Sequence, residues 1–228
     1  MISGQEYVQG IFITEIKNRF LCLVHINGED VVCYIPSSCR LSNFIDLTNR
    51  TVLLKPVLTP NARTKFSVYA LKYGRNYILL NLSQANRVIE EQIYRRYFSF
   101  LGKRKAVFRE VKIQEYKSDL YIKDTNTLIE IKSLLCFEKC GIFPTVYSER
   151  AISQLKKILV LLNEGYKVCY MLISLNPQVK EVVINHNIDD YYNLFCQCVD
   201  RGMEFRGFSV YLRDGIPEIY AKIPLHLK

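Results

Sequence analysis

Three residues in the middle of the chain combine two carboxylates with one lysine at a spacing that suits metal-assisted phosphodiester chemistry. Asp119 stands eleven residues before Glu130, and Asp124–Asn126 between them has the composition of a tight turn. If the flanking segments pair as antiparallel strands, Asp119 lies near Glu130, and Glu130 shares a face with Lys132 because side chains alternate along a strand. Hard divalent cations prefer carboxylate oxygens, and a lysine beside them orients a water or balances developing negative charge.

Neighbouring segments add polar residues that can reach the same place. Glu110 can enter the metal shell from the preceding element, and Arg150, Gln154 and Lys157 recur at helical spacing on one stripe of a later segment. The expected catalytic residues are Glu110, Asp119, Glu130, Lys132 and Gln154, and the expected ligands of Mg²⁺ or Mn²⁺ are Asp119, Glu130 and the carbonyl of Ile131.

Two simpler interpretations stay open at this stage. Glu130 can form a surface ion pair with Lys132 or Lys117, since exposed pairs of this kind are frequent and contribute little. Arg150 and Gln154 can equally belong to the solvent-exposed face of an amphipathic helix.

The segments that carry these residues have the pattern of an α/β unit. Ser148 is placed to cap a helix over Glu149–Asn163, whose apolar residues form one stripe. Lys167–Leu175 is almost continuously apolar, which is typical of a strand buried on both faces. The other predicted elements are strands over Val107–Tyr116, Asp119–Ile122, Thr127–Lys132, Met203–Leu212 and Ile216–Lys222 and a helix from Asp189/Asp190 to Arg201. Strands mixed with helices predict an α/β layout for residues 83–228.

Residues 1–82 have the pattern of an all-β unit. Asn27-Gly28 between two β-branched runs is a strong hairpin signal. The predicted strands are Val8–Glu15, Arg19–Ile26, Val31–Ile35, Thr51–Leu58, Lys65–Lys72 and Tyr77–Leu82. About five short strands in this length suit a small barrel of the oligonucleotide-binding (OB) type. A helix over Gln84–Leu101, capped by Ser83 and ended by Gly102, is expected to follow the boundary.

The distribution of charge points to a phosphate-rich partner. The chain carries 31 Lys+Arg against 22 Asp+Glu, a net charge of +9, and no acidic residue occurs from Leu47 to Ile89. A folded segment with one sign of charge makes a positive face, and nucleic-acid backbones are the commonest partner of such a face. The residues expected to contact DNA are Arg63, Lys65, Arg40, Arg87 and Arg150. A solubilising role for these charges is the alternative.

Composition excludes several classes of protein. The longest apolar run, Ile158–Leu162, is far short of the roughly 20 residues that a membrane span needs, so no membrane partner is expected. No secretory signal is visible, and eight cysteines without one are expected to be reduced thiols of a cytoplasmic protein. The spacings Cys136-x3-Cys140 and Cys196-x-Cys198 do not suit a zinc finger. The oligomeric state stays open, with a homodimer among the options.

Six ordered landmarks resemble the sugar fermentation stimulation protein A family. In chain order they are Asn61–Lys65, Leu80–Val88, Glu110–Lys112, Lys117–Asp119, Leu128–Ser133 and Gly141–Arg150. The Asp119, Glu130 and Lys132 set is intact, whereas Cys39 replaces a glycine of the family in the Pro36–Leu41 loop, where a side chain would strain a glycine conformation.

The resemblance implies an OB-like barrel followed by a nuclease-like α/β domain of the restriction-endonuclease, PD-(D/E)XK, type. It also implies DNA binding and a role in regulating sugar fermentation genes, notably those for maltose. The alternative that we carry forward is an active Mg²⁺- or Mn²⁺-dependent DNA nuclease that uses the acidic site. DNA is the expected partner in both cases, with little sequence preference.

Overall fold

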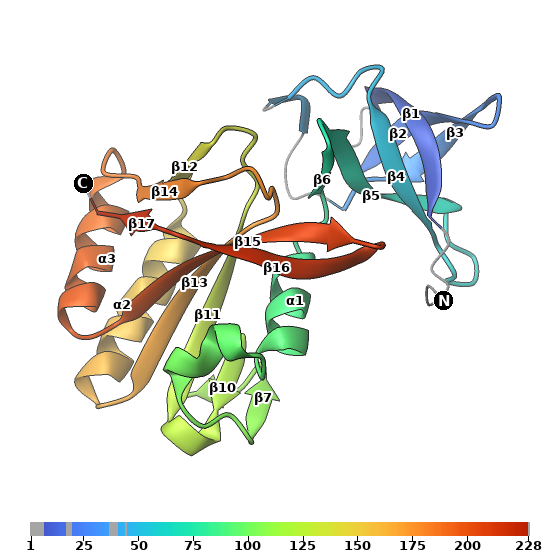
Figure 1. The fold of residues 1–228 in the computed structure, drawn as a ribbon. Coiled ribbons are helices and arrows are strands. Elements are labelled where there is room, and N and C mark those ends of the chain that lie inside the picture. The colour runs from blue at the N-terminus through green and yellow to red at the C-terminus, as the bar shows by residue number, and fades with distance from the viewer. Residues whose placement is uncertain (1–6, 17–19, 37–40, 44, 228) are drawn as a thin grey trace.

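An N-terminal barrel is followed by a layered α/β unit (Figure 1). The computed structural model describes residues 7–16, 20–36, 41–43 and 45–227. The barrel strands are β1 (Val8–Glu15), β2 (Leu21–Ile26), β3 (Glu29–Tyr34), β4 (Thr51–Pro56), β5 (Phe66–Tyr73) and β6 (Asn76–Leu79), with a short 3₁₀ turn at Leu41–Asn43. Each lies within a few residues of its predicted position, because the alternation of apolar and polar side chains marks a sheet with one buried face.

The six-stranded sheet closes on itself in the order β3-β2-β1-β4-β5-β6 through an additional pairing of β3 with β5. The hairpin between β2 and β3 turns at Asn27 (φ 50°) and Gly28 (φ 91°), the left-handed conformations that this dipeptide tolerates best. Side chains such as Val24, Val52 and Val68 fill the interior of the barrel. The predicted OB-type barrel is therefore confirmed.

Helix α1 (Gln84–Gln92) connects the two units and is shorter than expected. The predicted helix to Leu101 breaks after Gln92 and resumes as a 3₁₀ segment, Arg96–Leu101, with Gly102 (φ 71°) at its end. The expectation that the Ser83 side chain caps α1 is wrong, since its hydroxyl makes no cap hydrogen bond and instead donates to Asn81 Oδ1.

The α/β unit is built on a six-stranded mixed sheet in the order β16-β15-β13-β11-β10-β7. Its central strands, β11, β13 and β15, are parallel, and the outer pairings are antiparallel. The strands are β7 (Val107–Arg109), β10 (Leu120–Ile122), β11 (Thr127–Leu134), β13 (Lys167–Ser174), β15 (Glu204–Arg213) and β16 (Ile216–Ile223). Smaller sheets contain β8 (Lys112–Ile113), β9 (Tyr116–Lys117), β12 (Cys140–Phe143), β14 (Glu181–Ile184) and β17 (Leu225–His226).

The two faces of this sheet are covered differently (Figure 1). Helices α2 (Glu149–Asn163) and α3 (Asp189–Asp200) pack on one face, around Tyr170 and Leu172. Helix α1 and barrel residues such as Leu53 pack on the other face, around Met171. This continuous core places α1 against β11 and β16, beside the strands that carry the predicted site.

Val107–Tyr116 does not form the single strand that we expected. Glu110 (φ 52°) and Gln114 (φ 51°) adopt the left-handed conformation and break the segment into β7, β8 and β9. Two turns cannot be recognised from the apolar pattern of this stretch, because Glu and Gln are not typical residues at such positions. The break places Tyr116 and Lys117 close to Asp119 in a compact loop.

Among the described residues, no helix is long and apolar enough to cross a membrane. The seven cysteines in this part of the chain are all free thiols. Cys39 and Arg40 lie outside the described residues.

Candidate metal and nucleic-acid site

The pairing of β10 with β11 brings the two predicted carboxylates together. Leu120 pairs with Ile129 in antiparallel register, so Asp119 and Glu130 are the next residues along the ladder. Asp119 Oδ2 accepts a hydrogen bond from the backbone N–H of Ile131 at 2.7 Å. This bond anchors the first carboxylate to the strand that carries the second one.

Glu130 is a buried carboxylate, not part of a surface ion pair. Its side chain is 3% exposed, and its Oε1 lies 2.5 Å from Lys132 Nζ. The hydroxyl of Tyr116, which is itself buried, donates a hydrogen bond to Oε2 of Glu130. The simpler interpretation is therefore correct in naming Lys132 as the partner and incorrect in placing the pair at the surface.

Lys132 is held between the sheet and α2. Its Nζ donates a hydrogen bond to Gln154 Oε1 at 2.7 Å while it contacts Glu130. This geometry follows from two sequence signals, because Lys132 shares a strand face with Glu130 and the Ser148 hydroxyl caps α2 by accepting from the N–H of Ala151.

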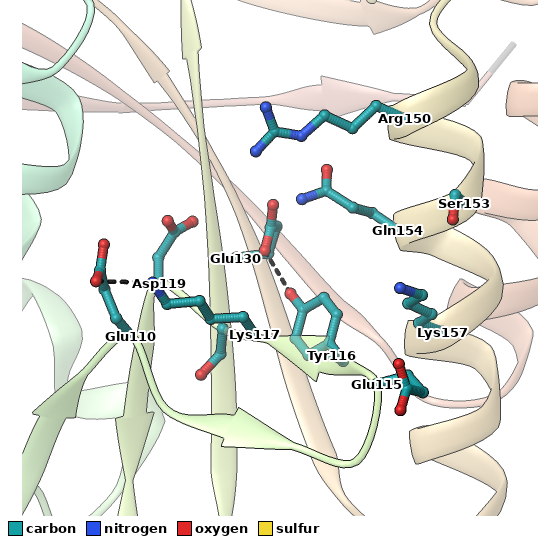
Figure 2. A pocket seen from close by; sticks show the side chains of 11 residues that line it. Glu110, Glu115, Tyr116, Lys117, Asp119, Glu130, Arg150, Ser153, Gln154 and Lys157 are labelled. Atoms are coloured by element: carbon teal, nitrogen blue, oxygen red, sulfur yellow. Dashed lines mark hydrogen bonds and ion pairs between the residues drawn. The ribbon is translucent and has the colours of Figure 1, made fainter.

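A cavity of about 370 Å³ is lined by Asp119, Glu130 and Gln154, whereas Lys132 is not among the described residues that line it. Figure 2 shows Arg150 and Gln154 extending from α2 toward Glu130, with Asp119 and Glu110 on the opposite side. Arg150, Gln154 and Lys157 all line the cavity, so this stripe of α2 faces the acidic residues. Helix α2 therefore lies close to the carboxylates of Asp119 and Glu130, as expected.

The sequence analysis missed two residues that contact the carboxylates. Tyr116 is one, and Asn86 of α1 is the other: its Nδ2 donates to Asp119 Oδ1 at 2.9 Å. Asn86 stands inside the landmark Leu80–Val88, which was the only available signal for it. Tyr116 had none, because the turn that places it was not predicted.

Burial and then the Glu130 carboxylate raise the pKa of Asp119, against the opposing effect of the Ile131 hydrogen bond. Burial also raises the pKa of Tyr116 well above its ordinary value, followed by the charge of Glu130. The phenol therefore stays protonated and donates to the carboxylate. Two carboxylates close to each other in a partly buried place repel unless a cation compensates them.

Glu110 lines the cavity, but its carboxylate is directed to Lys117 Nζ at 2.8 Å and is largely exposed. Hydrogen bonding from Lys117 lowers the pKa of Glu110. Within the described ranges no group of three or more acidic, histidine or cysteine side chains is close enough to hold a metal ion. The structure thus brings Asp119 and Glu130 together and leaves Glu110 paired at the rim.

The donor set of the cavity fits a hard divalent cation. Asp119 and Glu130 supply only oxygen donors, and Lys132 neutralises one of their two charges. The remaining negative charge and the mutual repulsion of the carboxylates favour a cation between them. Among the described residues no cysteine or histidine lines this cavity, so its donors are hard oxygen atoms and not the nitrogen and sulfur ligands that zinc prefers.

The predicted DNA contacts fall on three separate elements. Arg63 and Lys65 are exposed in the loop between β4 and β5, and Arg150 lines the cavity. Arg87 lies on α1, where its Nε contacts Glu91 Oε1 at 2.7 Å.

An OB-type barrel followed by a mixed α/β unit, with a buried Glu130 beside the half-buried Asp119, defines a class of two-domain proteins. The comparisons with known proteins place the chain in this class. The family model "SfsA N-terminal OB domain" matches residues 16–80, and "Sugar fermentation stimulation protein RE domain" matches residues 83–214. The chain belongs to the sugar fermentation stimulation protein family.

Relatives in this family are distant in sequence and similar in length. A sugar fermentation stimulation protein homolog of Clostridium beijerinckii is 29% identical over 180 residues, covering 77% of this chain and 76% of the relative. The homolog of Desulforamulus reducens is 22% identical over 226 residues, covering 97% and 93%. The structure of Pyrococcus furiosus SfsA in complex with Ca²⁺ superposes with a TM-score of 0.81 at 18% identity and covers 99% of both chains. This last likeness shows the fold.

Proposed function

We propose that this protein binds DNA and hydrolyses its phosphodiester bonds at the Asp119–Glu130 site with Mg²⁺ or Mn²⁺. The observation that carries the proposal is the buried Glu130 carboxylate, which is paired with Lys132, while Gln154 of α2 accepts from the same lysine. Glu130, Gln154 and Asp119 line one open cavity. Asp119 followed by Glu130-Ile131-Lys132 fits the PD-(D/E)XK pattern that the family resemblance implies. The Ca²⁺ bound in the Pyrococcus furiosus relative agrees with a divalent ion in such a protein.

Each residue of the cavity has a role that its contacts support. Asp119, Glu130 and the Ile131 carbonyl would hold the ion, which supplies Lewis acidity toward a phosphate oxygen. Lys132, paired with Glu130, would compensate the negative charge that develops on the phosphate. Gln154 keeps Lys132 in place. Arg150 extends into the cavity and donates to the other phosphate oxygens (Figure 2).

DNA would enter from the surface that carries the basic residues. Arg63 and Lys65 in the β4–β5 loop, with Arg87 and Arg150, supply positive charge on both units of the chain. We place the division between the units at residues 82 and 83, in agreement with the separate matches to residues 16–80 and 83–214.

A second candidate function is DNA binding without cleavage, as expected of a regulator of sugar fermentation genes. One observation favours it: both oxygens of Glu130 are already engaged, Oε1 by Lys132 and Oε2 by Tyr116. A carboxylate satisfied in this way is a weaker ligand than a free one. The regulated genes stay a prediction from the family resemblance.

One experiment separates the two functions. Mn²⁺ is titrated calorimetrically into the parent, Asp119→Asn and Lys132→Met, and the same proteins are incubated with plasmid and with single-stranded DNA, with and without Mn²⁺. Hydrolysis predicts that the parent binds Mn²⁺ and cleaves, that Asp119→Asn loses both, and that Lys132→Met still binds Mn²⁺ but cleaves about 10²-fold more slowly.

Two results would contradict hydrolysis. If the parent binds DNA but leaves it intact at millimolar Mn²⁺, the second function is supported. If Asp119→Asn binds Mn²⁺ as well as the parent does, the acidic pair is a structural ion-pair cluster and the metal site is wrong.

A further inference from the structure

A second cleft of about 630 Å³ lies along α1, next to the acidic cavity. Asn86 connects the two, because it lines this cleft and also donates to Asp119. Arg109, at the end of β7, lines the cleft, and the following residue, Glu110, lines the acidic cavity. A polymer that occupies the acidic cavity therefore has a concave path onward over α1.

Two arginines of this cleft are oriented by glutamates of α1. Arg87 donates from Nε to Glu91 at 2.7 Å, and Arg109 Nε lies 3.2 Å from Glu90. Both contacts use Nε, and in the described part of the chain no hydrogen bond engages the terminal nitrogens of either guanidinium. These nitrogens are the fork that matches a phosphate group, so each arginine is held in place with its donors available.

The cleft wall also contains an unsatisfied acceptor. Gln84 is 7% exposed, lines the cleft, and has no hydrogen-bond partner for its buried Oε1 among the described residues. Buried polar atoms are nearly always partnered, so this acceptor requires a donor such as a water or the N–H of a base, which a phosphate oxygen cannot supply.

The path continues onto the barrel at Lys55 of β4. Lys55 Nζ lies 5.1 Å from the centre of the Tyr69 ring, and no carboxylate within the described ranges forms an ion pair with it. Tyr69 belongs to the same core cluster as Ala85 and Val88 of α1, so Lys55 lies where the barrel and α1 meet. Burial and then the charge of Arg87 lower the pKa of Lys55. Neighbouring cations without a shared carboxylate repel, and an anion between them relieves this repulsion.

We propose that Arg109, Arg87 and Lys55 form a phosphate track that binds the nucleic-acid strand running from the acidic cavity over α1 to the barrel. The inference rests on the DNA binding in the proposed function and names its surface. The track explains why α1 carries both a contact to Asp119 and an arginine, Arg87, that lines the same cleft as Arg109 of β7. It also assigns the barrel a role in holding the strand beyond the scissile phosphate.

The test uses fluorescein-labelled dT4 and dT12, with binding followed by fluorescence anisotropy in EDTA at several NaCl concentrations. The variants are Lys55→Met, which keeps the aliphatic stem over Tyr69, Arg87→Gln and Arg109→Gln. Lys156→Ala, an exposed lysine of α2 outside both cavities, is the matched control. Melting temperatures establish that each variant is folded.

We expect the parent to bind dT12 more tightly than dT4, because only the longer strand reaches the barrel. Each track variant should weaken dT12 binding about threefold to tenfold and reduce the slope of log K against log[salt] by about 0.7, the value for one phosphate contact on a single strand. Binding of dT4 should change little, and Lys156→Ala should behave like the parent.

Three outcomes would overturn the track. One is dT12 affinity in the variants equal to that of Lys156→Ala, and another is an equal loss for dT4 and dT12, which indicates a general charge effect. A parent that does not bind dT12 removes the track, and the DNA binding of the proposed function is then decided by the plasmid arm of the earlier experiment. A parent that binds dT12 through the track and never cleaves DNA removes only the hydrolytic function.

Discussion

Asn86 on α1 donates a hydrogen bond from Nδ2 to Oδ1 of Asp119 over 2.9 Å. The other oxygen of Asp119 accepts from the Ile131 N–H, so both oxygens are held and the orientation of the carboxylate is determined. The two partners come from a connecting helix and from a central strand, 45 residues apart in sequence by their numbers. Residues that hydrogen-bond to a metal ligand fix its orientation, and the affinity of the site for the metal depends on that orientation.

Replacing Asn86 by Ala should therefore weaken Mn²⁺ binding about tenfold, with a small change in melting temperature, because the carboxylate loses one of its two orienting donors. Calorimetric titration measures the affinity. Asn187→Ala, an exposed asparagine before α3, is the control. An Asn86→Ala variant that keeps the parent's Mn²⁺ affinity, while Asp119→Asn loses it, would show that the hydrogen bond does not position the ligand.

Tyr116→Phe removes the hydroxyl that donates to the buried Glu130 carboxylate. We expect the free energy of unfolding to fall by about 1–3 kcal/mol without metal, the usual range for a hydrogen bond to a buried charge. Saturating Mn²⁺ should reduce this difference, because a cation takes over part of the compensation of Glu130. Urea unfolding with and without Mn²⁺ tests this, with the exposed Tyr147→Phe as control. An equal decrease in the free energy of unfolding with and without Mn²⁺ would show that the Tyr116 hydroxyl does not contribute to the metal site.

Arg63 and Lys65 are exposed in the β4–β5 loop. Replacing both with Ala should weaken binding to duplex DNA and lower the salt slope by about two, since each phosphate contact contributes about 0.9. The melting temperature should not move, because exposed charges contribute little to stability. Filter binding at several salt concentrations measures the affinity for duplex DNA and its salt slope. Affinity equal to that of Lys156→Ala would place the duplex elsewhere on the protein.

The thiols of Cys22 and Cys33 in the barrel should be unreactive in the folded protein. Burial raises the pKa of Cys33 to about 11 and raises that of Cys22 above its ordinary value. A raised pKa means less thiolate at pH 8, and the thiolate is the reactive form. Iodoacetamide at pH 8 should modify the exposed Cys140 first and reach Cys22 and Cys33 only in urea. Peptide mass spectrometry reads out the order, and rapid labelling of Cys33 in the native protein would contradict it.

Residue types and their local spacing were sufficient to predict much of the fold of this protein. The alternation of apolar and polar residues predicts β1 to β6. Asn27-Gly28 predicts the turn between β2 and β3, and Ser148 predicts the start of α2. The pairing of Asp119 with Glu130 follows from one short turn, because an antiparallel register is determined by the residues on either side of it. Lys132 joins the pair because strand side chains alternate.

Contacts between distant segments decided the rest. Asn86 reaches Asp119 only because α1 packs on the sheet face opposite α2, a placement determined by the shared apolar core and not by any local pattern. Tyr116 reaches Glu130 because Glu110 and Gln114 adopt left-handed conformations, which the tertiary contacts of the loop impose on residues with no preference for them. The same turns direct Glu110 to Lys117 and away from the carboxylate pair. Residue types and short spacings thus determine which groups share a strand or a helix face, whereas packing between elements determines which faces meet.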